Sequence, residues 1–188
     1  GKSMQEAVPP GEGAMVAVLG LTVNEVQSEI NLLPKEEICE IANDNCIGQI
    51  VVSGKKKNID KLTQNLKVKK KRAIYLPVSA PFHCSLMKKA AEKMRDKIEK
   101  TNFLKPKPGI ISNVNAKEEI DINNIKTLLV EQITSRVRWK EGVEYMIKEG
   151  VSDFLEIGPG KVLSGLVKKI DKNVLESNIN TLEDIKND

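Results

Sequence analysis

The stretch GAMVAVLGLTVNEVQSEINLL, residues Gly13–Leu33, contains the two patterns that decide the fold. Its first part, Gly13–Gly20, is a short apolar run bounded by glycines, which is typical of a buried strand. Apolar residues then recur at helical spacing over Asn24–Leu33. Thr22, with Glu25 three residues later, forms a capping-box pattern that predicts where this helix begins. A buried strand is therefore followed directly by an amphipathic helix.

The same kinds of pattern continue along the first half of the chain. Four further elements follow in this order: strand Glu37–Ala42, strand Gln49–Ser53, helix Asn58–Leu66 and strand Arg72–Val78. The order β-α-β-β-α-β within about seventy residues is that of the split βαβ, or ferredoxin-like, unit. We therefore predict a ferredoxin-like subdomain here.

Helices dominate the second half, with short strands between them. The predicted elements are helix Ser85–Ile98, strand Gly109–Asn113, helix Ile122–Ile133, helix Lys140–Glu149, strand Asp153–Ile157 and helix Val162–Ile170. Strands that alternate with helices favour a parallel sheet, but two strands are too few to form one. The remaining strands are expected upstream or in another chain. The start, Gly1–Gln5, has no initiator methionine, so we expect a piece of a longer protein.

Composition places the chain among globular proteins and excludes several classes. Of its 188 residues, 40% are hydrophobic and 30% are charged. The longest apolar run, Ala14–Leu21, is far shorter than the roughly 20 residues of a membrane span, so no membrane association is predicted. The three cysteines form no CxxC pair, which disfavours a disulfide framework or a zinc ribbon. We expect no metal and a reducing, cytoplasmic environment.

Positive charge is concentrated in one segment. Lys55–Arg72 contains nine basic residues and one acidic residue, a local charge of +8 in a chain whose total is +4. Such a run is either a solvated lysine face or a docking surface for an acidic protein or a phosphorylated ligand.

His83 is the only histidine, so any histidine chemistry must depend on it. It follows a predicted strand, in a loop stiffened by Pro77 and Pro81, where an acid–base residue is well placed. The alternative is a histidine packed in the loop for its shape. Gln132 lies beside the apolar stripe of its helix, where a buried amide would need a partner, although it is equally read as an ordinary glutamine at the edge of the core.

Three other chemical readings are weaker. Cys84 is adjacent to His83, but neighbouring residues in an extended loop point in opposite directions, which disfavours a cysteine–histidine pair. The segment Gly158–Lys161 departs from the phosphate-binding GxGxxG and GxxxxGK[ST] patterns and is better read as a tight turn. The pattern G-x-S-x-G is absent, so the chain has no nucleophile elbow.

Five separate segments resemble one family, in the same order along the chain. These are GKSMQEAVPPGEGAMVAVLGL, NDNCIGQIVVSG, LPVSAPFHCSLM, VEQITSRVRW and FLEIGPGKVLSGLVKKI. Together they resemble malonyl-CoA:acyl carrier protein transacylases, from residue 1 to about residue 170. The resemblance implies an α/β-hydrolase-like large subdomain with an inserted ferredoxin-like small one. Residues 1–12 would then end a large-subdomain helix and its linker, 13–80 would form the insert, and 81–188 would return to the large subdomain, which is incomplete here.

The resemblance also implies a reaction and its residues. A serine would take malonyl from malonyl-CoA and pass it to the phosphopantetheine thiol of acyl carrier protein, with no cofactor of the enzyme's own. His83 would be the catalytic base, oriented by the backbone carbonyl of Gln132, and Phe82 would narrow the space beside the malonyl α-carbon. Asn45 and Gln49 match positions near the mouth of the site.

Several parts of the family pattern lie before this chain. They are the GHSLGE elbow with its nucleophile, the GQGSQ oxyanion segment and the arginine that grips the malonyl carboxylate. Without the nucleophile the rate would fall on the order of 10⁴–10⁶-fold. We therefore predict that these 188 residues alone are inactive.

A non-catalytic ferredoxin-like module that binds an acidic carrier protein or RNA is the alternative. RNA recognition by such a sheet uses stacked aromatic residues, yet only 3% of the chain is aromatic and arginine is scarce, so we expect no nucleic-acid partner. Carrier-protein docking is compatible with the enzyme reading, and we assign it to Lys69, Lys70 and Lys71.

Overall fold

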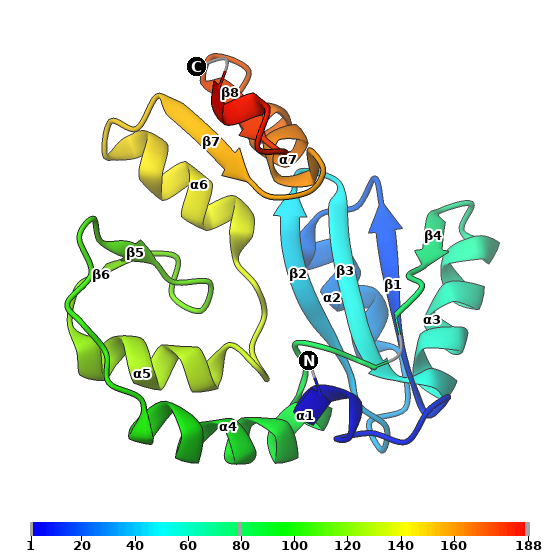
Figure 1. Cartoon of the computed structure of the whole chain (residues 1–188). Helices are drawn as coiled ribbons and strands as arrows, with labels where there is room; N and C mark the ends of the chain where they lie inside the picture. The colour runs from blue at the N-terminus through cyan, green and yellow to red at the C-terminus, as the bar shows by residue number, and fades with distance from the viewer. Residues whose placement is uncertain (1, 79, 187–188) are drawn as a thin grey trace.

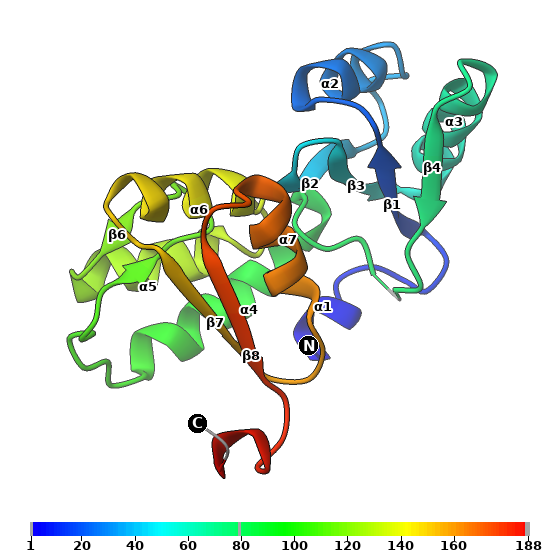
Figure 2. The same cartoon turned by 90° about the horizontal axis from the view of Figure 1, so that it is seen from above.

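A four-stranded antiparallel sheet with two helices forms the first half of the molecule (Figure 1). In the computed structural model, which describes residues 2–78 and 80–186, the strands lie in the order β2-β3-β1-β4. Their bounds are β1 (Gly13–Leu19), β2 (Cys39–Cys46), β3 (Gln49–Lys55) and β4 (Arg72–Tyr75). Helices α2 (Val23–Asn31) and α3 (Lys56–Val68) lie on the same face of the sheet (Figure 2). The predicted order of these six elements is confirmed.

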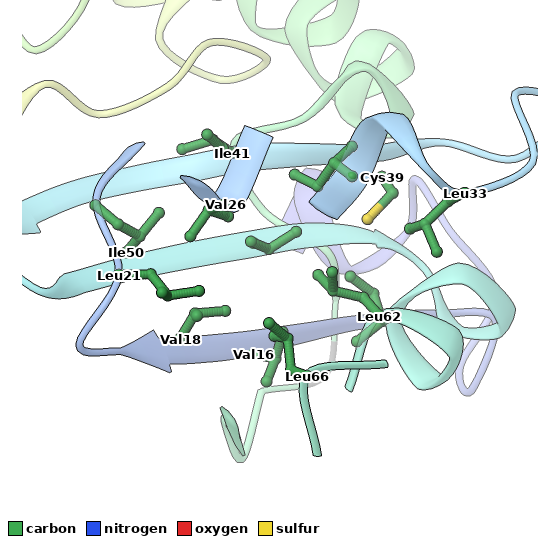
Figure 3. Close-up of a cluster of buried hydrophobic side chains, with 13 residues drawn as sticks. Val16, Val18, Leu21, Val26, Leu33, Cys39, Ile41, Ile50, Leu62 and Leu66 are labelled. Atoms are coloured by element: carbon green, nitrogen blue, oxygen red, sulfur yellow. The ribbon is translucent and has the colours of Figure 1, made fainter. Parts of the chain in front are cut away.

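The core of this half lies between the sheet and those two helices (Figure 3). Val16 and Val18 of β1 point into it with Leu62 of α3, and all three are completely buried. The predicted capping box is also confirmed, because the Glu25 carboxylate accepts the Thr22 amide at 2.8 Å and the Thr22 hydroxyl accepts the Glu25 amide at 3.3 Å. Alternating apolar residues and a local cap thus fix the sheet and the first helix.

The C-terminal ends of β2 and β4 differ most from the predicted strand boundaries. Strand β2 continues to Cys46, so the predicted loop after Ala42 is largely strand, and only Ile47 and Gly48 form the turn. Gly48 has φ +73°, a conformation that glycine adopts without strain. Strand β4 ends at Tyr75, two residues before Pro77, whose ring nitrogen cannot donate to a strand partner.

The second half is mainly helical and begins with the loop that carries His83. Its elements, with the short N-terminal α1, are α1 (Lys2–Gln5), η1 (Ser85–Met87), α4 (Lys88–Lys100), β5 (Ile110–Ile111), β6 (Glu118–Glu119), α5 (Ile122–Glu131), α6 (Trp139–Lys148), β7 (Asp153–Ile157), α7 (Val162–Ile170), β8 (Leu175–Ile179) and η2 (Asp184–Lys186). Ser79, which belongs to the segment LPVSAPFHCSLM, lies outside the described residues, as do Gly1 and residues 187–188.

Strand pairing in this half differs from the expectation. Strand β5 pairs with β6 as a two-residue antiparallel ladder and does not join β7. Strand β7 instead pairs in parallel with β8, which the sequence did not predict because LESNI carries little apolar alternation. The chain is an α/β protein. Within residues 2–78 and 80–186, no helix is long and apolar enough to cross a membrane.

Candidate active site

The loop before η1 holds His83 in an unusual backbone conformation. Its φ is +56°, in the left-handed region that non-glycine residues seldom occupy. Pro81, two residues earlier, is fully buried, and Cys84, the next residue, is 0% exposed. His83 itself is half-buried. Buried residues therefore anchor the loop on both sides of the histidine, while His83 itself stays partly exposed.

The structure brings His83 and Gln132 together, 49 residues apart in sequence. The Nδ1 atom of His83 lies 2.9 Å from the backbone oxygen of Gln132. Gln132 is the C-cap residue of α5, and carbonyls in the last turn of a helix have no partner within the helix. The helix end thus presents a free acceptor to the ring, and the contact is made by the backbone rather than by the side-chain amide.

This contact determines which ring nitrogen of His83 can act as a base. A carbonyl oxygen only accepts hydrogen bonds, so Nδ1 must carry the proton and donate it to Gln132. In the neutral ring Nε2 is then unprotonated and can accept a proton from a nucleophile. The arrangement can therefore perform general acid–base chemistry, with Gln132 fixing the tautomer.

Phe82 lies where the two halves of the molecule meet. Its ring packs against the apolar cluster of α4 and α5 and also against the cluster formed by Met15, Ala42 and Val51 on the sheet face away from α2 and α3. The residue before the histidine is thus wedged between the two parts, which ties the position of the loop to both.

Asn45 and Gln49 lie on the hairpin of β2 and β3, away from the His83 loop. Gln49 pairs with Cys46 across the two-residue turn, and its side-chain oxygen accepts from Lys169 Nζ of α7 at 3.4 Å. Asn45 is half-buried near the end of β2. The structure gives neither residue a contact with His83.

Lys69, Lys70 and Lys71 lie in the turn between α3 and β4, at the opposite edge of the sheet from β2 (Figure 1). The structure therefore separates them from His83. All three are exposed, although Lys69 pairs with Glu29 of α2 at 2.7 Å. Acidic residues on neighbouring elements thus offset part of the local charge that the sequence showed.

Neither Cys84 nor the segment Gly158–Lys161 offers reactive chemistry. Burial raises the pKa of the Cys84 thiol, which donates to the carbonyl of Pro81 at 3.1 Å. After Gly158–Lys161, the Glu156 carboxylate accepts the amide and hydroxyl of Ser164 at the start of α7, each at 2.7 Å. A carboxylate of the chain itself therefore occupies the place of an anion at this helix N-terminus.

Sequence reasoning missed the residues that hold the His83 loop against the sheet. Glu40 of β2 accepts the amide and the hydroxyl of Ser85, at 2.8 Å and 2.6 Å. The hydroxyl of Ser53 in β3 lies 3.6 Å from the sulfur of Cys84. These pairs are 45 and 31 residues apart, and no local pattern in the sequence marks them.

The segment after Gln132 is also held by the sheet. Val137 donates to the carbonyl of Ala42 at 2.8 Å and accepts from the amide of Asp44 at 2.9 Å. The β2–β3 register shifts between Ile41 and Asn43, and such a bulge leaves Ala42 without a partner on β3. The free edge of β2 is thus used to bind the chain beyond the helix end.

Metal chemistry has no support among the residues that the structure describes. Within that part of the chain no group of three or more His, Cys, Asp or Glu side chains could hold a metal ion. The three cysteines, Cys39, Cys46 and Cys84, are free and buried.

Comparison with known proteins finds similar chains that share one name. The malonyl CoA-acyl carrier protein transacylase of Staphylococcus aureus (strain COL) is 45% identical over 188 residues, covering 99% of this chain and 61% of that protein. The crystal structure of the Clostridium perfringens transacylase matches with a TM-score of 0.93 and 44% identity, over 99% of this chain and 59% of that one. No family model matches the chain.

A further solved structure contains a carrier protein. It is a type II PKS acyl-carrier protein in complex with its malonyl-transacylase, and it matches with a TM-score of 0.93 and 36% identity over 98% of this chain and 60% of that chain. By sequence and by fold, the chain is related over nearly all its length to malonyl CoA-acyl carrier protein transacylases. It spans about three fifths of the relatives that it matches.

Proposed function

We propose that this chain is the C-terminal portion of a malonyl-CoA:acyl carrier protein transacylase and supplies the base of its active site. The whole protein would move malonyl from malonyl-CoA to the phosphopantetheine thiol of acyl carrier protein through an acyl-serine, for fatty acid biosynthesis. The observation that carries this proposal is the 2.9 Å contact of His83 Nδ1 with the Gln132 carbonyl, in a chain 45% identical to such enzymes.

His83 acts twice in the proposed reaction. Its Nε2 takes the proton of the serine hydroxyl as the oxygen attacks the thioester, and gives that proton to the departing sulfur of CoA. It later takes the proton of the carrier thiol as the sulfur attacks the acyl-serine, and returns that proton to the serine oxygen. During both steps the ring becomes positively charged. The Gln132 carbonyl, as an acceptor on Nδ1–H, stabilises that charge and keeps Nε2 directed at the nucleophile.

The other assignments follow from the similarity to these enzymes. Phe82 restricts the space beside the malonyl α-carbon, and Asn45 and Gln49, which lie on the β2–β3 hairpin away from the His83 loop, line the mouth of the site. We propose that residues 13–80 are a ferredoxin-like insert, which the order β2-β3-β1-β4 and the two helices on one face support. Residues 1–12 and 81–188 then belong to an α/β-hydrolase-like large subdomain.

The surroundings of the reaction are simple. The chemistry needs no cofactor beyond the pantetheine groups that substrate and partner carry. Three free cysteines are in keeping with a reducing cytoplasm. The exposed lysines 69–71 supply positive charge for an acidic carrier protein.

A chimera tests this function. The chain is joined to the N-terminal two fifths of the 45% identical Staphylococcus aureus relative, and malonyl transfer to acyl carrier protein is followed by intact mass. We expect transfer by the chimera and a loss of about 10²–10⁴-fold in His83→Ala, the usual contribution of a general base. The chain alone is expected to gain no malonyl group. Equal rates with and without His83 would refute the assignment.

A further inference from the structure

We propose that Glu40 is a positioning residue, which acts through Ser85 to hold His83 in register with Gln132. This inference rests on the proposed role of His83 as the base. Glu40 lies outside the five segments that resemble the family, whereas Ser85 lies within one of them. The proposal gives strand β2 the task of anchoring the segments that carry both partners of the histidine contact.

The first observation is the pair of hydrogen bonds between Glu40 and Ser85. One carboxylate oxygen accepts the Ser85 amide at 2.8 Å, and the other accepts the Ser85 hydroxyl at 2.6 Å. Bonds to an ionised carboxylate are stronger than those between neutral groups, and two of them fix an orientation as well as a distance. Ser85 is the first residue of η1 and stands two residues after His83. The sheet is therefore bonded to the chain immediately beyond the histidine.

A neighbouring contact also ties the loop after His83 to the sheet. Ser53 of β3 is the cross-strand partner of Glu40, so the two side chains leave the same face of the sheet. The Ser53 hydroxyl lies 3.6 Å from the sulfur of Cys84 and is completely buried. Two adjacent positions of the sheet thus contact the two residues that follow His83.

Strand β2 also binds the segment that follows Gln132, the other residue of the histidine contact. Val137, five residues after Gln132, is bonded to the carbonyl of Ala42 at 2.8 Å and to the amide of Asp44 at 2.9 Å. Glu40, Ala42 and Asp44 are alternate residues of the same strand. The segments that contain His83 and Gln132 are therefore both hydrogen-bonded to the same strand, although they are far apart in sequence.

The backbone of His83 explains why such support is needed. A side chain at φ +56° costs roughly 1–2 kcal/mol relative to the right-handed region, so the conformation persists only where neighbouring contacts enforce it. If Ser85 is released, the loop can relax toward negative φ, and the ring then leaves the Gln132 carbonyl. Without that acceptor the proton is no longer confined to Nδ1.

The tautomer of His83 gives a direct measurement in this chain. Because His83 is the only histidine, a sample labelled with ¹⁵N-histidine gives one pair of ring nitrogens, whose shifts report the ratio of Nδ1–H to Nε2–H in the neutral ring. We expect Nδ1–H to dominate in the wild type. In Glu40→Ala the ratio should fall about three- to ten-fold, the factor equivalent to one net hydrogen bond.

Matched variants separate positioning from general damage. Glu36→Ala removes the same charge from an exposed residue four positions away and should leave the ratio unchanged. Ser85→Ala, which keeps the backbone bond, should give a smaller fall, and Ser85→Thr, which keeps the hydroxyl, should restore the wild-type ratio. If Glu40→Ala fails to fold, Ser85→Ala against Ser85→Thr decides.

Two results would overturn the proposal. They are an unchanged ratio in both Glu40→Ala and Ser85→Ala, or an equal fall in Glu36→Ala. The tautomer ratio of His83 does not depend on catalysis. An inactive chimera would refute the proposed function but would not change the measured ratio.

Discussion

Gly13→Ala is expected to destabilise the chain through the loop that carries His83. A Cβ atom at Gly13 would lie 2.4 Å from Cγ and 2.5 Å from Cδ of Pro81, whose ring is fully buried. The ring must therefore move by about 1 Å to reach ordinary contact, and overpacking of this kind costs about 1–3 kcal/mol. Alanine also reduces the conformational entropy of the unfolded chain, which offsets about 0.4–1 kcal/mol of this cost. The free energy of unfolding should therefore fall by about 1–2 kcal/mol.

The control is the same substitution at Gly165, which is exposed within α7 and has nothing within 4 Å of the added Cβ. Alanine has a higher helix propensity than glycine, so Gly165→Ala should raise the free energy of unfolding by about 0.5–1 kcal/mol. Urea unfolding followed by far-UV circular dichroism measures the free energy of unfolding of both variants. We expect the two changes to have opposite signs. A Gly13→Ala midpoint at or above that of the wild type would contradict the contact on which the argument depends.

Three further predictions concern single groups. Hydrogen bonds from Ser164 hold the pKa of Glu156 below its usual range, so its contribution to stability is present above that range and is lost as pH falls through the lowered pKa. Thermal melts should therefore give Glu156→Gln a lower Tm than the wild type at neutral pH. This difference should begin to shrink below about pH 4.3, the unperturbed Glu pKa, and be lost as pH falls through the lowered pKa. Burial raises the pKa of Cys39 to about 12, and the other two cysteines are also buried, so an aromatic disulfide reagent should label the native chain far more slowly than the unfolded one. Fast labelling of all three thiols at neutral pH would count against their burial. In the chimera, reversing the charge of lysines 69–71 should raise KM for acyl carrier protein and leave hydrolysis of malonyl-CoA largely unchanged, whereas unchanged carrier kinetics would make these lysines a solvated face.

Local patterns were sufficient to predict the first half of the fold. The apolar run of β1 and the box formed by Thr22 and Glu25 depend on neighbours in the sequence, and both are present in the structure. The extension of β2 to Cys46 was missed because Asn43, Asp44 and Asn45 have low strand propensity, which pairing with β3 overrides.

Long-range contacts of the site could be predicted only in part. His83 and Gln132 were singled out, one for its chemistry and one for its place on a helix. The resemblance implies that the Gln132 carbonyl meets the ring, as the structure shows, whereas the residue pattern alone points to the side-chain amide. The difference depends on where α5 ends, and a boundary of this kind is the least certain feature of a helical pattern. The hydrogen bond that Ser85 donates to Glu40 joins two ordinary polar residues, so composition and periodicity do not indicate it.

The two halves of the chain differ in how completely they bury their own apolar surface, and this difference predicts where the chain opens first. The sheet of β1–β4 has a closed core against α2 and α3. Parallel strands are usually covered on both faces, yet Leu155 and Ile157 of β7 are 51% and 76% exposed, and Leu175 of β8 is 65% exposed.

Because the pair β7–β8 has few buried contacts, its amides should exchange through local opening, while those of β1 and β3 should exchange only through larger unfolding. Native-state hydrogen exchange by NMR measures both sets in one sample. We expect protection factors at least about 10-fold higher in β1 and β3, the ratio that 1.4 kcal/mol of opening free energy corresponds to. Joining the N-terminal part of the relative should raise protection in β7–β8 specifically, because we expect that part to cover the exposed leucine and isoleucine side chains. Equal protection in the two sheets of the isolated chain would mean that β7–β8 needs no such cover.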